Sequence, residues 1–250
     1  MNEAPSTAPD APPAGPTFAP TRYVMVGLGG IGTHVIRLMT QFLHSQRQNT
    51  TIVAIDGDEF ESRNRERMQF ERLGPKAKVM CEELGPQYGD VVNFLPVPRY
   101  LTSRNVGRYI AEGDVVLCQP DNHKTRHLVE KRCAKLDNVA LISGGNDGVE
   151  KDRTGTYGNV QIYVRTDGID LSNGLSRFHP EIADPQDLLP TEKGCGATIE
   201  SAPQLLFTNA SVAAAMVSAF YAWWIGRLGY EEVYLETLQA KMVPVSRAVA

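Results

Sequence analysis

A glycine-rich turn between a short apolar run and a helix-like segment constrains the fold of this chain most strongly. Gly27, Gly29 and Gly32 form a GxGxxG pattern directly after the apolar run 23–26. In such a turn the first glycine permits a tight bend, the second lets backbone approach a phosphate, and the third lets helix and strand pack closely. The helix N-terminus then offers unpaired N–H groups to an anion. The pattern predicts a nucleotide site on a strand–helix unit.

The segments after this turn continue as alternating strands and helices. A second apolar run at 51–55 ends in Asp56, and this spacing is typical of a parallel βαβ unit. Further strand-like runs lie at 91–95, 114–118 and 139–143, with helix-like runs at 77–84, 104–111 and 126–135. The order predicts an α/β fold with a Rossmann-like, doubly wound and mainly parallel sheet.

The second half of the chain has a different character. It holds an alternating segment at 158–165, an irregular stretch at about 166–200, a long apolar helix at about 203–228, and hairpin-like runs at 233–237 and 241–245. Irregular stretches of that length inside a compact domain are usually functional or mobile. We expect a C-terminal antiparallel extension of the sheet, a crossover loop over the irregular stretch, and a single domain over 22–250.

Composition limits the partners that the chain is expected to have. A hydrophobic fraction of 42% and a net charge of −4 without a basic run are typical of a globular protein that does not bind nucleic acid. Residues 1–21 are rich in Pro and Ala and are expected to form a disordered tail. The apolar stretch 205–225 contains several polar residues, so we expect a buried helix and no membrane span.

The four cysteines form no CxxC pair, which argues against a zinc site. Cys81, Cys118 and Cys133 lie in helix-like or strand-like runs, as expected of free thiols in a reducing cytoplasm. Cys195 differs, because it lies between two glycines at the end of the irregular stretch.

Charged residues after the second strand favour a triphosphate. Asp56 follows the strand where a carboxylate can bind ribose hydroxyls. Asn64, Arg67 and Lys76 follow it, and a dehydrogenase has no use for such groups, whereas β- and γ-phosphates need cations. Asp121 follows the strand at 114–118 and suits Mg²⁺ bound to a triphosphate. The alternative role for Asp121 is the N-cap of the next helix.

Taken together, these motifs resemble the ThiF/MoeB/ubiquitin-activating superfamily. The resemblance rests on the glycine turn, Asp56-x-Asp58, Asn64, Arg67, Pro75-Lys76-Ala77, and Asp121-Asn122-x-x-Thr-Arg126. It implies that the phosphates of ATP are lined by Gly27, Gly29, Gly30 and Gly32, and that the ribose is held by Asp56. It also implies that the triphosphate is contacted by Asn64, Arg67 and Lys76, and that Mg²⁺ is bound by Asp121. Asp58 and Asn122 would belong to the same site. Arg67, Lys76 and Asp121 are accordingly the expected catalytic residues.

The resemblance also implies an activity and a partner. Such enzymes adenylate the C-terminal carboxylate of a ubiquitin-like or sulfur-carrier-like β-grasp protein that ends in glycine, and they release pyrophosphate. Some members then transfer the acyl group to a cysteine, for which Cys195 is the candidate, with a structural thiol as the alternative. Members of this size usually form homodimers, here expected through the 203–228 helix.

The second half of the chain is also similar to the ThiF-family protein of PRTRC systems, over residues 178–184, 194–196 and 204–209.

The chain departs from the superfamily in three respects. Met68 stands where members often have Gln, the zinc-binding CxxC pairs are missing, and the Pro/Ala-rich tail replaces an Arg-containing helix. Three alternatives stay open: an NAD(P)-dependent oxidoreductase, an inactive scaffold, and an enzyme that adenylates a peptide or tRNA.

Overall fold

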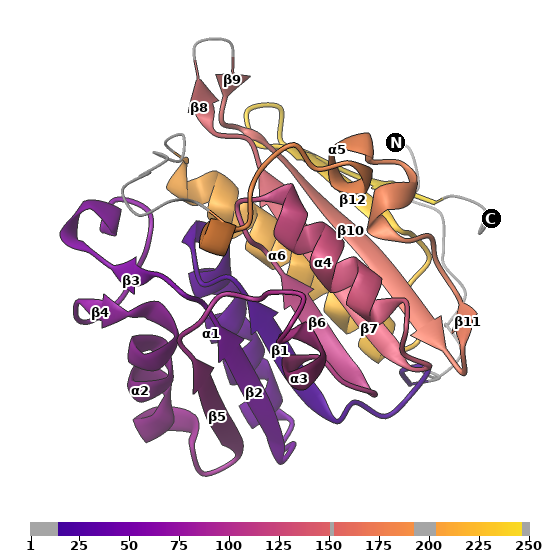
Figure 1. Ribbon diagram of the computed structural model, residues 1–250, viewed down its shortest axis with the longest axis horizontal. Helices are drawn as coiled ribbons and strands as arrows, with labels where there is room; N and C mark the ends of the chain where they lie inside the picture. Colours follow the sequence, from indigo (N-terminus) through magenta and orange to yellow (C-terminus); the bar gives the residue numbers. More distant parts are fainter. Residues whose placement is uncertain (1–14, 151–152, 193–203, 247–250) are drawn as a thin grey trace, which may run out of the picture.

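The computed structural model describes residues 15–150, 153–192 and 204–246. Its centre is a nine-stranded sheet in the order β13-β12-β10-β7-β6-β1-β2-β5, with β11 paired to β10 (Figure 1). The strands are β1 (Arg22–Val26), β2 (Thr50–Ile55), β5 (Val92–Val97), β6 (Asp114–Cys118), β7 (Val139–Asn146), β10 (Tyr157–Thr166), β11 (Ile169–Asp170), β12 (Glu232–Glu236) and β13 (Lys241–Val245). Two small hairpins lie outside it, β3 (Glu59–Phe60) with β4 (Gly74–Pro75) and β8 (Val149–Glu150) with β9 (Arg153–Thr154).

The strand directions confirm the predicted fold class. The five strands from β5 to β7 run parallel, and β10, β12 and β13 add to β7 as an antiparallel extension. The helices are α1 (Gly30–Ser45), α2 (Lys76–Tyr88), α3 (Val106–Tyr109), α4 (His123–Cys133), α5 (Pro180–Ala183) and α6 (Leu206–Trp224). The carboxyl ends of β1, β2 and β6 therefore lie at one edge of the sheet.

The helices cover both faces of the sheet, as a doubly wound fold requires (Figure 1). Side chains of β1 alternate between two hydrophobic clusters. Tyr23 and Met25 belong to the cluster with α1, α2 and α6, whereas Val24 and Val26 belong to the cluster with α3 and α4. Burial on both faces explains why β1, β6 and most of β2 and β7 read as apolar runs in the sequence, whereas the edge strand β5 is largely exposed.

Helix α6 is shorter than the sequence suggests, and it is the most apolar of the described helices. It ends at Trp224, two residues before Gly226, whose φ of +68° takes the chain out of the helix. By length and mean hydropathy (1.2) it is the one helix among the described residues that could cross a membrane, and half of that window is buried inside the protein. Val212, Met216 and Phe220 are among its core residues.

Residues 17 and 18, which the sequence places in the tail, contact the folded body. The ring of Phe18 lies 5.0 Å from that of Trp223, between centroids. The Thr17 hydroxyl lies 2.9 Å from that of Thr166. The folded part of the chain therefore begins before the boundary expected at residue 22.

Candidate functional site

The glycine turn after β1 is held in one conformation from two sides. Gly27 has a φ of +89°, which glycine adopts without strain. A Cβ on Gly32 would lie 2.1 Å from the Gly27 carbonyl oxygen, so no side chain fits there. The Gln119 Nε2 donates to the same carbonyl oxygen at 2.8 Å. The first N–H groups of α1 have no partner within their helix, so at this turn they are available to a ligand.

Asp56, at the end of β2, braces the turn. Its Oδ2 accepts the backbone N–H of Leu28 at 2.6 Å, and its Oδ1 accepts that of Asp58 at 2.8 Å. Burial raises the pKa of Asp56, although Lys76 and the two backbone donors oppose that effect. Each oxygen retains a lone pair, so Asp56 can still accept the ribose hydroxyls expected of it.

Lys76 is a buried cation next to these carboxylates. It is the first residue of α2, is 5% exposed, and its Nζ lies 3.0 Å from Asp58 Oδ2. Burial by itself lowers the pKa of the Lys76 ammonium. The negative charges of Asp56, Asp58 and Asp121 outweigh burial, so the pKa lies above its usual value. Lys76 therefore keeps its charge, and all three carboxylates lie within its electrostatic reach.

Tyr100, which lies outside the sequence motifs, completes this cluster. Its hydroxyl donates a short hydrogen bond to Asp58 Oδ1. Burial and the Asp58 hydrogen bond raise the pKa of Tyr100. A Cβ built on Gly57 would lie 2.6 Å from the Tyr100 ring, so the ring packs flat on the backbone after Asp56.

The loop after β6 places Asp121 at the rim of the site. The N-cap of α4 is Asn122, whose Oδ1 accepts the Thr125 N–H at 2.8 Å, so the alternative role of Asp121 as that cap is wrong. The Asn122 Nδ2 lies 3.3 Å from Asp121 Oδ1. Asp121 is exposed, so its carboxylate is accessible while its neighbour supports both it and the helix.

Arg126, the last residue of the Asp121 motif, supports the same loop. Its guanidinium is buried and donates to Ser143 Oγ at 2.6 Å, to Pro120 O at 2.9 Å and to Gly144 O at 2.8 Å. Burial lowers the pKa of Arg126. These three bonds join the ends of β6 and β7, so Arg126 fixes the position of the loop that carries Asp121.

The crossover segment after β11 docks on α4, next to Asp121. The Asp187 carboxylate accepts the N–H groups of His123 at 2.5 Å and Lys124 at 2.9 Å. Lys124 Nζ lies 2.6 Å from Glu192 Oε2. The described part of the crossover is thus anchored at the first turn of α4.

The sequence model of the ThiF family matches residues 17–242, nearly the whole chain. This chain belongs to the ThiF family. The match confirms the superfamily resemblance seen in the motifs. No curated protein matches the chain in sequence at a significant level.

Solved structures show the same fold as this ThiF-family chain. E. coli MccB with ATP has a TM-score of 0.64 at 16% identity, over 93% of this chain and 66% of MccB. MccB in complex with N-formylated MccA has a TM-score of 0.66 at 17% identity, over 91% of this chain and 65% of MccB. PaaA has a TM-score of 0.62 at 14% identity, over 91% of this chain and 65% of PaaA. The chain thus spans just under two thirds of the length of these proteins, and identities this low establish the fold alone.

Two expected triphosphate ligands of the ThiF-family domain lie on the connection between β3 and β4. Asn64 ends a 3-10 turn, where its Oδ1 accepts the Glu61 N–H at 3.0 Å, and Arg67 follows half-buried. The Met68 methyl lies 3.8 Å from the position of a Cβ built on Gly29. The connection therefore reaches the glycine turn through Met68, the residue that stands where the superfamily often has Gln.

The last expected site residue, Cys195, lies outside the described residues of the ThiF-family domain. Tyr100, Gln119 and Asp187 are supporting residues that the sequence motifs do not include. The sequence offered a signal for Gln119 alone, because it lies two residues before Asp121.

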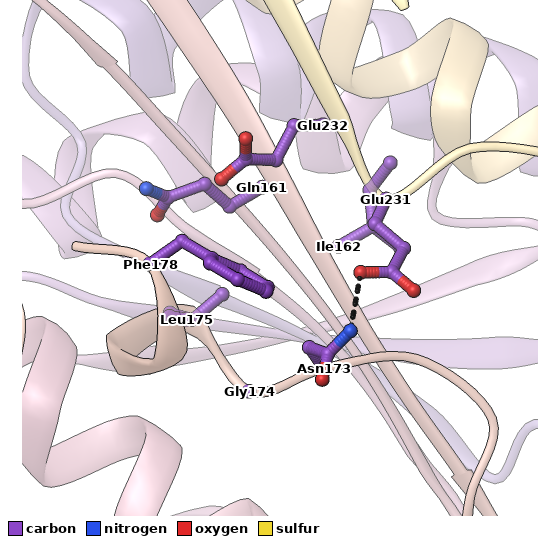
Figure 2. Close-up of a pocket in the computed structure, with 8 residues that line it drawn as sticks. All are labelled: Gln161, Ile162, Asn173, Gly174, Leu175, Phe178, Glu231 and Glu232. Atoms are coloured by element: carbon purple, nitrogen blue, oxygen red, sulfur yellow. Dashed lines mark hydrogen bonds between the residues drawn. The ribbon is translucent and has the colours of Figure 1, made fainter. Parts of the chain in front are cut away.

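A small hollow that lies away from the glycine turn has no room for a substrate. Its volume is about 10 Å³, and it lies between the crossover and the antiparallel strands. Figure 2 shows the residues that line it, with Asn173 bonded to Glu231 at its edge. That volume holds about one water molecule. The candidate functional site of the ThiF-family domain is the glycine turn with the Lys76 cluster, because a buried cation and three carboxylates gather there.

Proposed function

We propose that this ThiF-family domain uses ATP to adenylate a carboxylate, namely the C-terminal carboxylate of a small protein or peptide. The observation that carries the proposal is Lys76, a buried cation surrounded by carboxylates beside a glycine turn. A triphosphate brings several negative charges and needs a fixed cation and backbone donors. Both are present within one edge of the sheet.

The reaction needs positioning and charge stabilisation rather than proton transfer. An oxygen of the ionised substrate carboxylate forms a bond to the α-phosphorus. The bond from that phosphorus to the oxygen bridging the β-phosphate breaks, and pyrophosphate leaves with the electron pair. We assign binding of the α-phosphate to the first turn of α1 and of the outer phosphates to Lys76, Arg67 and Asn64. Fixed cations of this kind stabilise the transition state because they need no reorganisation.

Asp121 is the residue that we propose as a ligand of Mg²⁺. Mg²⁺ in nucleotide sites is usually held by one or two carboxylates together with phosphate oxygens. Asp121 offers an exposed carboxylate, and among the described residues no cluster of three His, Cys, Asp or Glu side chains forms a metal cage. When bound, the ion would neutralise charge on the triphosphate. Asp121 and Asn122 would hold it at the rim of the site.

A small protein with an accessible C-terminus is the partner that we propose. MccB, the structural relative above, is solved in complex with MccA. A β-grasp protein ending in glycine stays our preferred partner on the superfamily resemblance, with a peptide as the alternative. Residues 178–184 and 204–209 are similar to the PRTRC-system protein, and this similarity supports our proposal that the chain is of the PRTRC subtype of the ThiF family.

Pyrophosphate exchange with candidate partners tests the function. We expect wild type to exchange labelled pyrophosphate into ATP only with a partner that has a free C-terminal carboxylate, and not with the same partner amidated. Asp121→Asn is expected to lower exchange at least tenfold without lowering thermal stability, because its side chain is exposed. Exchange that persists with the amidated partner would reject carboxylate adenylation. Partner-independent reduction of NAD(P)⁺, followed by absorbance, would favour the oxidoreductase alternative.

Transfer to Cys195 is a separate step of the proposal. The thiolate would attack the acyl carbon of the adenylate, forming a thioester and releasing AMP. The three described cysteines are free and buried, which supports a reducing, cytoplasmic location but gives them no access to an acyl group. A thiol-labile adduct that forms in wild type and not in Cys195→Ala would support the step. An active enzyme without an adduct would remove it.

We also propose a homodimer through α1 and α6. These helices pack against each other, and Phe42 and Tyr221 meet with ring centroids 5.9 Å apart. Leu38, Phe207 and Tyr221 nevertheless stay exposed on their outer face. An exposed apolar face of two packed helices is typical of an interaction surface.

A further inference from the structure

Asn209, on the first turn of α6, is a buried amide whose hydrogen-bonding capacity is unused. The residue has no exposed surface, and neither Nδ2 nor Oδ1 has a partner among the described residues. Buried side-chain amides are nearly always hydrogen-bonded, since an unmade bond costs the full desolvation of the group. An unpaired amide of this kind therefore points to a partner that the protein chain itself does not supply.

The amide lies against the candidate nucleotide site. A Cβ built on Gly30, the first residue of α1, would lie 2.1 Å from Asn209 Nδ2 and 3.0 Å from Gln204 Oε1. The Asn209 side chain thus occupies the space that any larger residue at position 30 would need. Asn209 is also four positions into α6, where its N–H makes the first bond of that helix, to Leu205 O at 3.0 Å. Helix α6 therefore brings an amide to the first turn of α1.

A second carboxamide flanks the same turn from another strand. Gln119 Nε2 is bonded to Gly27 O and lies 3.1 Å from the position of a Cβ on Gly32. Its Oε1 is also buried without a partner, but that atom is an acceptor, so Gln119 can offer a phosphate only the second N–H of Nε2. The first turn of α1 adds backbone N–H donors between them. A group that accepts from several converging N–H donors is an oxyanion, so the arrangement favours a phosphate.

We propose that Asn209 is a further phosphate-binding residue of this site, whose Nδ2 donates a hydrogen bond to the phosphate oxygen held by the first turn of α1. This inference rests on the proposed function and names a ligand group from α6, which lies outside the motifs that predicted the site. Because Asn209 has no exposed surface, its side chain or the first turn of α1 must shift for Nδ2 to meet a ligand atom, and that atom would then lie against Gly30. Within ATP, that atom belongs to the phosphate nearest the turn, the α-phosphate of the adenylation step.

The test compares nucleotides that differ in phosphate content. We expect Asn209→Ala to weaken ATP and AMP binding by about 10- to 100-fold in calorimetric titrations and to leave adenosine binding unchanged. Thr208→Val is the matched control, since Thr208 lies on the same turn, is equally buried, and has an unpartnered hydroxyl. The control is expected to bind all three as wild type does. Equal losses for adenosine and ATP in Asn209→Ala, or no loss for either, would overturn the inference.

Two further variants keep the test valid if Asn209→Ala is unstable. Asn209→Asp keeps the shape of the side chain and places a carboxylate by the phosphate, so it should lower the ratio of ATP to adenosine affinity more than Asn209→Ala does. Gly30→Ala alone should lower the melting temperature, and adding Asn209→Ala should restore it, because the amide no longer meets the methyl group. An unchanged affinity ratio in Asn209→Asp rejects phosphate contact. Failure of wild type to bind ATP at all would instead reject the proposed function.

Discussion

The Lys76 ammonium lies 3.0 Å from the Asp58 carboxylate, and only the lysine of this pair is buried. The lysine stem and its charge are enclosed at the first residue of α2, while half of the Asp58 side chain stays exposed. A nucleotide phosphate can therefore approach the same ammonium from the side of Asp58. The pair holds the cation in place, and Asp56 and Asp121 add negative charge around it.

Replacing Lys76 should weaken ATP binding and destabilise the fold, two effects that can be measured separately. Lys76→Met should weaken ATP binding at least tenfold, because the phosphate contact is lost, and lower the free energy of unfolding by about 1–3 kcal/mol. The stability loss is smaller than for a fully buried pair because Asp58 is half exposed. Lys78→Met is the control, since Lys78 lies on the same helix and is exposed. Calorimetry and denaturant unfolding measure the two effects, and equal ATP affinity in Lys76→Met and Lys78→Met would contradict the role of Lys76.

Asp56 should leave a signature in the dependence of stability on pH. Burial raises its pKa in the folded protein above the usual value of 3.8. Its contribution to stability is then fully present below that value and is lost as pH rises through the folded pKa. The difference in free energy of unfolding between wild type and Asp56→Asn, which does not titrate, should decrease as pH rises above about 4 and become constant above the folded pKa. A difference that increases over this range would mean that the folded protein favours the carboxylate anion.

Asp187 is expected to control the order of the crossover. Asp187→Ala removes the acceptor for the N–H groups of His123 and Lys124, which is comparable to losing a helix cap and costs about 1 kcal/mol. Hydrogen exchange of residues 171–192 should accelerate in this variant. Asp184→Ala, a change of an exposed carboxylate in the same segment, should not accelerate it. Equal exchange in both variants would show that the cap does not anchor the crossover.

The outer face of α1 and α6 predicts the solution mass. Phe207→Asp should convert a homodimer to a monomer in light scattering, because a carboxylate cannot be buried there unpaired. Leu238→Asp, at the exposed turn between β12 and β13, should leave the dimer intact. A wild type that is already monomeric at micromolar concentration would reject the dimer.

Local patterns predicted the fold and the framework of the site, and partners distant in sequence escaped them. Gly27 and Gly32 follow from turn geometry, and Asp56 and Lys76 from their places at a strand end and a helix start. Gln119 and Asp187 act through single side chains whose partners are 92 and 64 residues away. No periodicity encodes such contacts, because strand order and the path of the crossover decide them.

The choice between Asp121 and Asn122 as the cap of α4 was also beyond sequence reasoning. Both residue types are good N-caps, and they are adjacent. What decides is backbone geometry, since Asn122 has the extended dihedrals that place its side chain over the N–H of Thr125. Asp121 is thereby left at the rim.

The pairing of β1 with β6 has a consequence for how the protein is made. Arg22 lies beside Asp114 across these strands, 92 residues further along the chain. Strand β6 carries Gln119 to the glycine turn, so that turn lacks its second support until almost half of the polypeptide has been synthesised. Closing so long a loop is entropically costly and slow compared with local contacts. A nascent chain that holds only β1, α1 and β2 therefore has the glycine motif but not yet the shaped site, and the ability to hold a nucleotide is expected to arise late, when β6 inserts beside β1.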